Sequence, residues 1–408
     1  MSRENSTSRI LMVANNFPPT RGGSAVVYAN LAHHLASRVL VVAAKASYAD
    51  GLAQIGWREH DRAATYEVRR LPLLRTQLHA TGSRLGFLAG DVMIRLRLAG
   101  LIMAQVLTGG AHCVCVGELL ASHWVLTLCR LLPGVRSVVY VHGEEITTEV
   151  GYDRGHNRAR AALLSADAII VVSRFTQQAV RTLLGEEGSK AEIHLIENGV
   201  DTQRFRPVGR RPDLVAQYRL QPGRIFVSVC RLLEKKGIDQ AIRAFARVHR
   251  VHPDTSYVVV GTGGFEASLR EIAAAEGVAE RVIFTGDVTE DDLVAHYCLG
   301  DMFVMPNREM ENGDTEGFGL VFLEANSCGL PVIAGSDGGS RDAVQHGVNG
   351  LVVNGRSVEA ITQAMLDLLQ DDALRARLIE GAQMVSQAAD WRRKTEMFTA
   401  ICEGGTLS

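Results

Sequence analysis

Residues 224–251 read RIFVSVCRLLEKKGIDQAIRAFARVHRV, and this stretch holds the pattern that decides the fold. Arg224–Cys230 is a short apolar run without regular polar alternation, which indicates a strand covered on both faces. A basic loop ending at Gly237 follows, and Ile238–Val251 is predicted to be a helix. A strand, a loop and a helix in this order are typical of parallel strands joined by crossover helices.

The same alternation extends through the whole chain. Further strands are predicted at Arg9–Ala14, Val39–Ala43, Glu67–Leu71, His112–Val116, Ser137–Val141, Ala168–Val172, Glu192–Ile196, Ser256–Val260, Arg281–Thr285, Met302–Met305, Pro331–Ala334 and Gly350–Val353. Predicted helices include Ser24–Ala36, Leu119–Leu132, Phe175–Leu184, Leu320–Cys328, Val358–Gln370, Ala373–Ala388 and a last one around Trp391–Cys402. The pattern predicts an α/β fold of two Rossmann-like, doubly wound domains, with ligands bound in the cleft between them.

The alternation is interrupted once, near the middle of the chain. It stops at Asn198–Asp201, and Arg206–Gly223 is rich in Arg, Pro and Gly without apolar periodicity. We therefore predict an interdomain linker at Arg206–Gly223. The predicted domains are residues 1–200 and 201–385, followed by a C-terminal helical segment, residues 386–408.

The composition excludes several classes of protein. The 408 residues, 47% hydrophobic and 22% charged, are enough for two domains. A formal net charge of −2, with 43 basic and 45 acidic side chains, lacks the basic excess of a nucleic-acid-binding protein. The seven scattered cysteines predict neither a CxxC metal site nor a disulfide framework. Met1–Arg9 is polar, without the apolar core of a signal peptide, so a cytoplasmic location is expected.

One segment is unusually apolar. Leu85–Leu107 has a helical period, but Asp91, Arg95 and Arg97 interrupt it, and a membrane-spanning helix needs about 20 nearly uncharged residues. Two interpretations stay open: a helix packed on a sheet, or peripheral contact with a membrane surface.

Two loops in the first half follow predicted strands. Pro18–Ser24 contains Gly22 and Gly23 just before a helix, and free amides at a helix start attract phosphate. Val141–Glu145 places His142 at the carboxyl end of a strand, where ligands bind in such sheets. The latter sequence is not HExxH, so a zinc protease is not supported.

Two loops in the second half carry charge. Arg231 and Lys236 lie five residues apart before a helix, which suits a diphosphate, although a solvated basic loop is the simpler alternative. Glu316 and Glu324 stand eight positions apart, one before a helix and one inside it. Gly317 and Gly319 leave the amides between them open to an anion.

Together these patterns resemble a known family. Its features here are the E-x7-E pair Glu316–Glu324, the R-x4-K pair Arg231–Lys236, Gly22-Gly23, Asn198–Asp201, Pro331–Ala334 and Gly338-Gly339. They are similar to retaining glycosyltransferases of the family-4 type, which have the GT-B fold. The resemblance is loose in the first domain and close from Ile225 to Gly350.

The resemblance implies roles for the individual residues. His142, Glu316, Arg231 and Lys236 would be catalytic; Gly22, Gly23, Arg231, Lys236, Gly263, Gly317, Phe318, Gly319, Leu320 and Glu324 would bind the donor. Arg231 and Lys236 would hold the donor diphosphate, and Glu324 the ribose. Glu316 would contact the donor sugar, and His142 would approach the reacting face.

The resemblance also implies the reaction. The donor would be a GDP-sugar or UDP-sugar of the mannose or glucose type, without a further cofactor or bound metal. The acceptor, on the N-terminal domain, would be a lipid-linked glycan or saccharide in polysaccharide or glycolipid synthesis at the cell envelope. The last helix would cross back to that domain.

Two departures and two alternatives remain. Asp342 stands where the family often has Glu, and Arg308–Gly313 resembles a polar insertion that could reshape the sugar pocket. A nucleotide-sugar epimerase on the same architecture is one alternative. A catalytically silent, nucleotide-sugar-binding partner of a polysaccharide assembly complex is the other. A phosphorylase would need a lysine for pyridoxal phosphate, and no such signature is visible.

Overall fold

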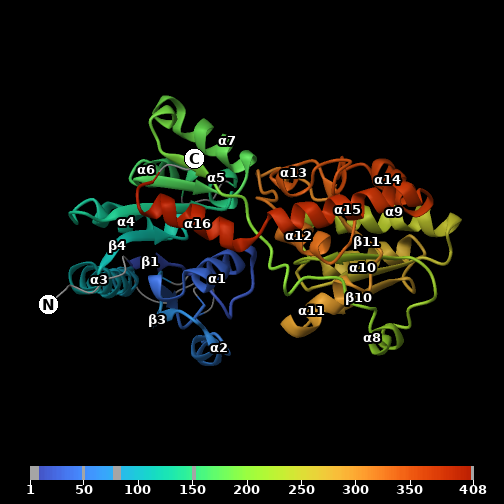
Figure 1. Cartoon of the computed structure of the whole chain (residues 1–408), viewed down its shortest axis with the longest axis horizontal. Coiled ribbons are helices and arrows are strands. Elements are labelled where there is room, and N and C mark those ends of the chain that lie inside the picture. The colour runs from blue at the N-terminus through green and yellow to red at the C-terminus, as the bar shows by residue number, and fades with distance from the viewer. Residues whose placement is uncertain (1–8, 48–50, 77–83, 149–152, 406–408) are drawn as a thin grey trace. The chain divides into compact units, whose positions relative to one another are not determined.

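The structure, a computed structural model, describes residues 9–47, 51–76, 84–148 and 153–405. They form two compact units (Figure 1). The first comprises the described parts of residues 1–172, 176–196 and 391–408, and the second residues 173–175 and 197–390. The polar segment on which the absence of a signal peptide was predicted lies almost entirely outside the described residues.

The described residues of the first unit contain a seven-stranded sheet. Its order is β3-β2-β1-β4-β5-β6-β7, and every neighbouring pair is parallel. The strands are β1 (Arg9–Val13), β2 (Val39–Ala44), β3 (Glu67–Leu71), β4 (Ala111–Val116), β5 (Arg136–Val141), β6 (Ala168–Val171) and β7 (Ile193–Leu195). Strands β2 and β6 are buried at every position, and β1, β4 and β5 at all but one, because helices cover both faces of the sheet.

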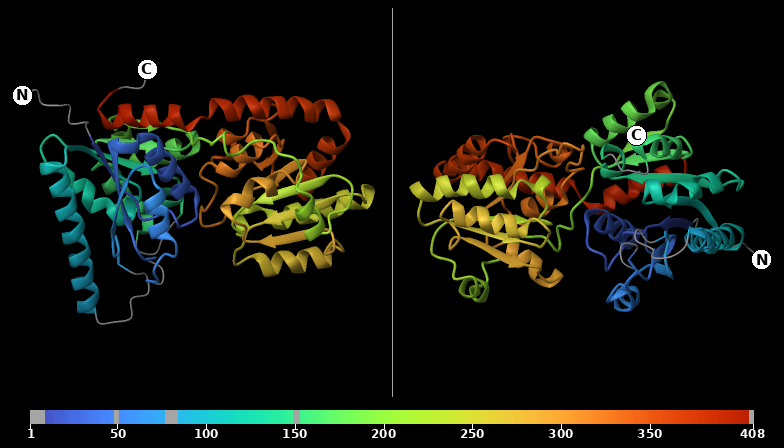
Figure 2. Two further views of the ribbon diagram at one scale, coloured as in Figure 1. Left: turned by 60° about the horizontal axis from the view of Figure 1, so that its bottom comes forward. Right: turned by 180° about the vertical axis from the view of Figure 1, so that it is seen from behind.

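The helices of this unit follow the strands in alternation (Figures 1 and 2). They are α1 (Gly23–Leu35), α2 (Trp57–Ala63), α3 (Arg84–Thr108), α4 (Leu119–Cys129), α5 (Glu144–Thr147), α6 (Asn157–Leu163), α7 (Arg174–Leu184) and α16 (Trp391–Cys402), with 3₁₀ turns at Ala36–Arg38, Arg154–His156 and Gly185–Ser189. Helix α16, from the end of the chain, packs on α1. Arg136 Nε also donates to the carbonyl of Ile401 at 2.8 Å.

The second unit repeats the architecture. The six strands described there have the order β10-β9-β8-β11-β12-β13, again all parallel. They are β8 (Ile225–Val229), β9 (Ser256–Val260), β10 (Val282–Gly286), β11 (Met302–Met305), β12 (Val332–Gly335) and β13 (Gly350–Val353). The helices are α8 (Pro212–Gln217), the 3₁₀ turn η4 (Glu234–Lys236), α9 (Ile238–Val251), α10 (Glu266–Ala275), α11 (Glu290–Tyr297), α12 (Leu320–Ser327), α13 (Ser340–Ala343), α14 (Val358–Gln370) and α15 (Asp372–Ala388).

The predicted fold class is confirmed, and the predicted strands agree with the structure to within about a residue at each end. The linker prediction at Arg206–Gly223 is wrong. This stretch contains α8, with Leu214 buried, and it belongs wholly to the second unit. A helix of six residues offers too few positions for an apolar period to show. Within the described part of the chain, no helix is both long and apolar enough to cross a membrane.

Candidate active site

A glycine shapes the basic loop after β8. Gly237 has a φ of 73°, and a Cβ there would lie 2.0 Å from the carbonyl oxygen of Pro306. Left-handed backbone and close backbone approach both favour glycine. The turn therefore ends η4 and brings Lys236 toward the loops that follow β11.

Lys236 is paired with Glu316. Its Nζ donates a hydrogen bond to Oε2 of Glu316, and the two side chains are only 12% and 15% exposed. Burial raises the pKa of Glu316, but the charge and hydrogen bond of Lys236, with smaller contributions from Lys235 and Arg231, bring that pKa below its usual value. Glu316 is therefore ionised at neutral pH. Two of the predicted catalytic residues, Lys236 and Glu316, lie in direct contact.

Arg231, the second predicted cation, differs from Lys236 in its surroundings. It is exposed, and its guanidinium forms no hydrogen bond or ion pair with any residue that the structure describes. Its charge still contributes to the lowered pKa of Glu316. Arg231 therefore has its donors available for an anionic ligand.

Lys235 is a residue that the sequence analysis passed over. Its side chain is 7% exposed, and Nζ donates to Oδ1 of Asp314 at 2.5 Å and to the carbonyl of Thr315 at 3.3 Å. These bonds hold the backbone immediately before Glu316. In the sequence a Lys-Lys pair is typical of a solvated loop, and only the fold shows that one of the two lysines is buried.

The predicted insertion Arg308–Gly313 is also anchored. The guanidinium of Arg308 is 7% exposed and bonds Asp239 at 2.7 and 3.1 Å and Glu234 at 3.2 Å. The insertion borders a cavity of about 660 Å³. This cavity is lined by Leu233, Glu234, Lys235, Arg308, Met310, Glu311, Asn312, Asp314 and Arg356. The insertion thus lies next to the basic loop, and its effect on sugar binding stays a prediction.

Glu324 occupies a different place from Glu316. It lies in α12, and Oε2 accepts a hydrogen bond from the hydroxyl of Tyr297 at 2.6 Å. Burial raises the pKa of Glu324, and the hydrogen bond from Tyr297 opposes this rise. Tyr297 is fully buried at the end of α11, and sequence spacing gave no signal that it would meet α12.

The loop between the two carboxylates is packed closely by backbone. The amide of Gly339 donates to the carbonyl of Glu316 at 2.7 Å, and a Cβ at Gly339 would lie 2.0 Å from the carbonyl of Gly317. Phe318 is buried at 3% exposure, which anchors the loop from the protein side. Gly319, with a φ of 90°, ends the loop where α12 begins at Leu320.

Gly263 has a packing reason to be glycine. A Cβ there would lie 2.3 Å from the carbonyl of Leu232, and the Leu232 amide donates to the carbonyl of Thr262 at 2.9 Å. The glycine loop after β9 therefore lies directly against the basic loop after β8. Contact of Gly263 with a donor stays a prediction.

In the first unit, Gly22 and Gly23 begin α1 as predicted for an anion-binding helix start. A side chain at Gly22 would meet no described atom within 4 Å, so the space beside it is open. Gly23 is exposed, and the first amides of α1 have no side-chain cap. These unpaired donors are the groups that a phosphate would use.

His142 follows β5 and is fixed by Tyr28 of α1. The hydroxyl of Tyr28 donates its single proton to the carbonyl of Gly117 at 2.5 Å and lies 2.7 Å from Nε2 of His142. Nε2 must therefore be the donor to Tyr28, which leaves Nδ1 as an acceptor. Burial lowers the pKa of His142 to about 4, so the ring is neutral at physiological pH.

Glu118, after β4, is a second group that the sequence analysis missed. Its Oε1 accepts from the amide of Asn16 at 2.7 Å, while Oε2 is buried without a partner among the described residues. Burial raises the pKa of Glu118 to about 7. Glu145 accepts from the amide of His142 at 2.8 Å, and burial raises its pKa too. A glutamate two residues after a strand carries no sequence pattern that would have identified it.

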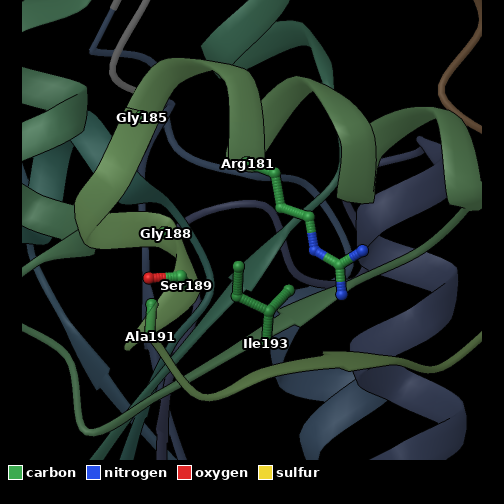
Figure 3. Close-up of a pocket in the computed structure, with 6 residues that line it drawn as sticks. All are labelled: Arg181, Gly185, Gly188, Ser189, Ala191 and Ile193. Carbon is green, nitrogen blue, oxygen red and sulfur yellow. The ribbon is translucent and has the colours of Figure 1, made fainter.

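Two further features lie apart from these groups. Asp342, the departure from the family pattern, accepts from the amide of Arg174 at 2.8 Å and is 7% exposed. A pocket of about 400 Å³ lies between α7 and β7, where Figure 3 shows the side chains of Arg181 and Ile193 side by side. The other residues that line it are Gly185, Gly188, Ser189 and Ala191, and none is a predicted site residue.

Comparison with known proteins agrees with this arrangement. The model of Glycosyltransferase Family 4 matches residues 21–204, and that of Glycosyl transferases group 1 matches residues 211–385. A GDP-mannose-dependent alpha-(1-6)-phosphatidylinositol monomannoside mannosyltransferase of Mycobacterium tuberculosis is 34% identical over 95% of this chain and 96% of its own. The protein of the same description from Mycolicibacterium smegmatis is 32% identical over 97% of this chain and 98% of its own.

Solved structures show the same fold. HepE of Anabaena, determined in complex with UDP and glucose, covers 97% of this chain and 99% of its own with a TM-score of 0.77 at 20% identity. The predicted GT-B fold and glycosyltransferase activity are thereby confirmed, and neither a nucleotide-sugar epimerase nor a silent partner is supported. The chain therefore belongs to the glycosyltransferases that combine a Glycosyltransferase Family 4 domain with a group 1 glycosyl transferase domain.

Proposed function

We propose that the protein transfers mannose from GDP-mannose to a phosphatidylinositol mannoside or a very similar glycolipid, with retention of anomeric configuration. The carrying observation is the 34% identity with the Mycobacterium tuberculosis mannosyltransferase over 95% of this chain. A relation over this length includes both units, whereas the motifs of the second unit alone suit a GDP-sugar and a UDP-sugar equally. This relation is why we favour GDP-mannose.

We infer a role for each predicted donor contact from the family pattern and the local contacts. Arg231 and Lys236 hold the diphosphate, and Glu316 binds hydroxyls of the donor sugar beside it. Glu324, held by the Tyr297 hydroxyl, binds the ribose. In the second unit, the backbone around Gly263, Gly317, Phe318, Gly319 and Leu320 completes the donor site. In the first unit, the helix start at Gly22 and Gly23 binds phosphate.

The chemistry requires stabilisation of the leaving group. When the bond between the sugar C1 and the diphosphate oxygen breaks, negative charge builds on GDP. The acceptor oxygen bonds to C1 on the same face, and its proton passes to the departing diphosphate. Arg231 and Lys236 stabilise that charge without a bound metal, each contributing about 1.5–3 kcal/mol as a charged hydrogen-bond donor. His142, neutral and with Nδ1 free to accept, contacts hydroxyls near the reacting carbon.

Transfer assays test this proposal. The protein is incubated with phosphatidylinositol monomannoside in mixed micelles and with GDP-mannose, GDP-glucose, UDP-glucose or UDP-galactose in turn. We expect mass spectrometry to show addition of one hexose with GDP-mannose, and NMR to show an α-linkage. A product formed only with a UDP-sugar would overturn the donor assignment. A β-linkage would overturn retention.

A lipid acceptor remains in its membrane, so the protein has to work at a membrane surface. We place that surface on the cytoplasmic side, because all seven cysteines are free thiols and this suits a reducing compartment.

A further inference from the structure

Helix α3 carries an exceptional share of the exposed apolar side chains. Of the sixteen large hydrophobic residues found exposed in the described part of the chain, eight lie on α3. They are Leu85, Phe87, Leu88, Val92, Met93, Leu96, Met103 and Leu107. Scattered single hydrophobic residues on a surface are ordinary, but a contiguous group marks an interaction site.

Most of these side chains form one stripe. At about 100° per residue, six of them fall within an arc about 100° wide that runs about 33 Å along the helix. The six, which we call the α3 stripe, are Leu85, Leu88, Val92, Leu96, Met103 and Leu107. The face that packs on the core is turned by about 90–130° from the middle of the stripe and carries Leu98 and Ile102, both fully buried. The stripe therefore faces away from the core to which α3 is attached.

Arginines flank the stripe, and the one at Arg97 leaves that margin with a net positive charge. Arg95 lies to one side of it by helical rotation and Arg97 to the other. Asp91, the one acid between Arg84 and Thr108, turns toward the protein side, where it pairs with Arg95 at 2.7 Å. Arg97 is exposed and has no ion pair among the residues that the structure describes. An apolar stripe between arginines is typical of a helix that lies in the interface of an anionic membrane.

The position of α3 connects this surface to the chemistry. The helix leads directly into β4, so it runs antiparallel to the strands of its sheet (Figure 2, left). Its 25 residues span about 37 Å, while six-residue β4 spans about 20 Å. The fully buried side chains begin only at Leu98, so the first turns of α3 extend past the carboxyl edge of the sheet. His142 follows β5 at this same edge.

We propose that the α3 stripe is the surface by which this protein lies on an anionic lipid membrane. The inference rests on the proposed function, in which the acceptor is a lipid. With the bilayer along α3, whose first turns extend past the carboxyl edge of the first sheet, a lipid acceptor presents its head group beside that edge while its acyl chains stay in the membrane. Arg97 at the margin of the stripe meets the lipid phosphates.

A second copy of this chain fits the stripe less well. Two stripes packed against each other would place Arg97 of both helices at the rim of the contact, and Asp91, the one acid of α3, is already paired to Arg95. Like charges in such a contact destabilise it, whereas anionic head groups are complementary to the same arginines.

Vesicle co-sedimentation tests the proposal without donor or acceptor, so its failure is distinct from failure of the proposed transferase reaction. The full-length protein is mixed with vesicles of phosphatidylcholine alone or of phosphatidylcholine with phosphatidylglycerol. The test variants are Leu88→Gln/Leu96→Gln, which places two amides in the stripe, and Arg97→Glu. The matched control is Leu131→Gln/Met384→Gln, because both of these side chains are also strongly exposed, at 76% and 64%, but lie outside α3.

We expect the wild-type protein and the control to bind the anionic vesicles, and the leucine double variant to lose at least about tenfold in partition coefficient. Arg97→Glu should lose several-fold on anionic vesicles, and added salt should weaken binding of the wild type. Unchanged thermal melting and GDP binding identify the variants as folded. Equal binding by the wild type and the leucine variant would overturn the proposal. So would light scattering that shows a wild-type dimer dissociated by the same two substitutions.

Discussion

The Lys236–Glu316 pair leads to opposite effects of two substitutions on donor binding. Lys236→Ala removes a cation from the diphosphate site and leaves the buried Glu316 carboxylate without its partner. Glu316→Gln removes the carboxylate and leaves Lys236 free to serve the diphosphate alone. If the residues have the proposed roles, the first variant loses nucleotide binding, and the second loses transfer but keeps nucleotide binding.

The magnitudes follow from the burial of the pair. A charged hydrogen bond in such a site contributes about 1.5–3 kcal/mol, so Lys236→Ala should raise the Kd for GDP by roughly 10- to 150-fold. Glu316→Gln takes a negative charge away from the diphosphate, so we expect a Kd equal to that of the wild type or up to about tenfold lower. The same variant should lower kcat by about 100-fold or more, because the donor sugar loses a charged contact.

Calorimetric titration with GDP measures the first two effects, and initial rates with GDP-mannose measure the third. Glu309→Gln is the matched control, since Glu309 is an exposed acid close to the same loop. The double variant Lys236→Ala/Glu316→Gln should bind GDP more tightly than Lys236→Ala, because no unpaired carboxylate remains. The reasoning is refuted if Glu316→Gln weakens GDP binding tenfold, or if Lys236→Ala leaves that binding unchanged.

Three other predictions follow from neighbouring contacts. Tyr28→Phe removes the hydroxyl that fixes Nε2 of His142 as a hydrogen-bond donor, so kcat should fall about tenfold with little change in the KM for the nucleotide sugar. A tenfold fall in kcat with an equally large rise in that KM would contradict a role of Tyr28 in orienting the ring. Burial raises the pKa of Glu118 from 4.5 to about 7, so the native protein keeps a proton on this carboxyl that the unfolded chain loses. The free energy of unfolding therefore falls as the pH rises between these values. Glu118→Gln should remove this fall in thermal melts from pH 4.5 to 8 and stabilise the protein at pH 8 by up to about 3 kcal/mol. Lys235→Met should lower the free energy of unfolding by about 2 kcal/mol and raise the KM for the nucleotide sugar. The double variant Lys235→Met/Asp314→Asn should recover part of the lost stability and part of the change in KM. An unchanged KM would limit Lys235 to a structural role.

The architecture could be predicted because each strand reports its own burial. Parallel strands covered on both faces are continuous apolar runs, and Val39–Ala44 is apolar at every position and buried at every position. The GT-B arrangement followed from the combination of loop motifs rather than from any single loop. Helix α8 was missed for a local reason, since its six residues are too short for a period to be visible.

The candidate site could be predicted only as a set of positions, because a motif does not specify which charges meet. Lys235 and Lys236 are adjacent and chemically alike in the sequence, but the backbone through η4 and Gly237 directs one ammonium to Asp314 and the other to Glu316. Likewise, Glu316 and Glu324 belong to one sequence pattern, and burial raises the pKa of both. Only Glu316 meets a lysine, whose charge and hydrogen bond bring its pKa below the usual value, whereas the pKa of Glu324 stays raised. The partners that influence these pKa values lie far away in the sequence: Tyr297 is 27 positions from Glu324, and Lys236 is 80 positions from Glu316. The ionised state of Glu316 is therefore encoded in the fold, and a chain with the same E-x7-E spacing but without the Lys236 contact would not hold that carboxylate in the same state.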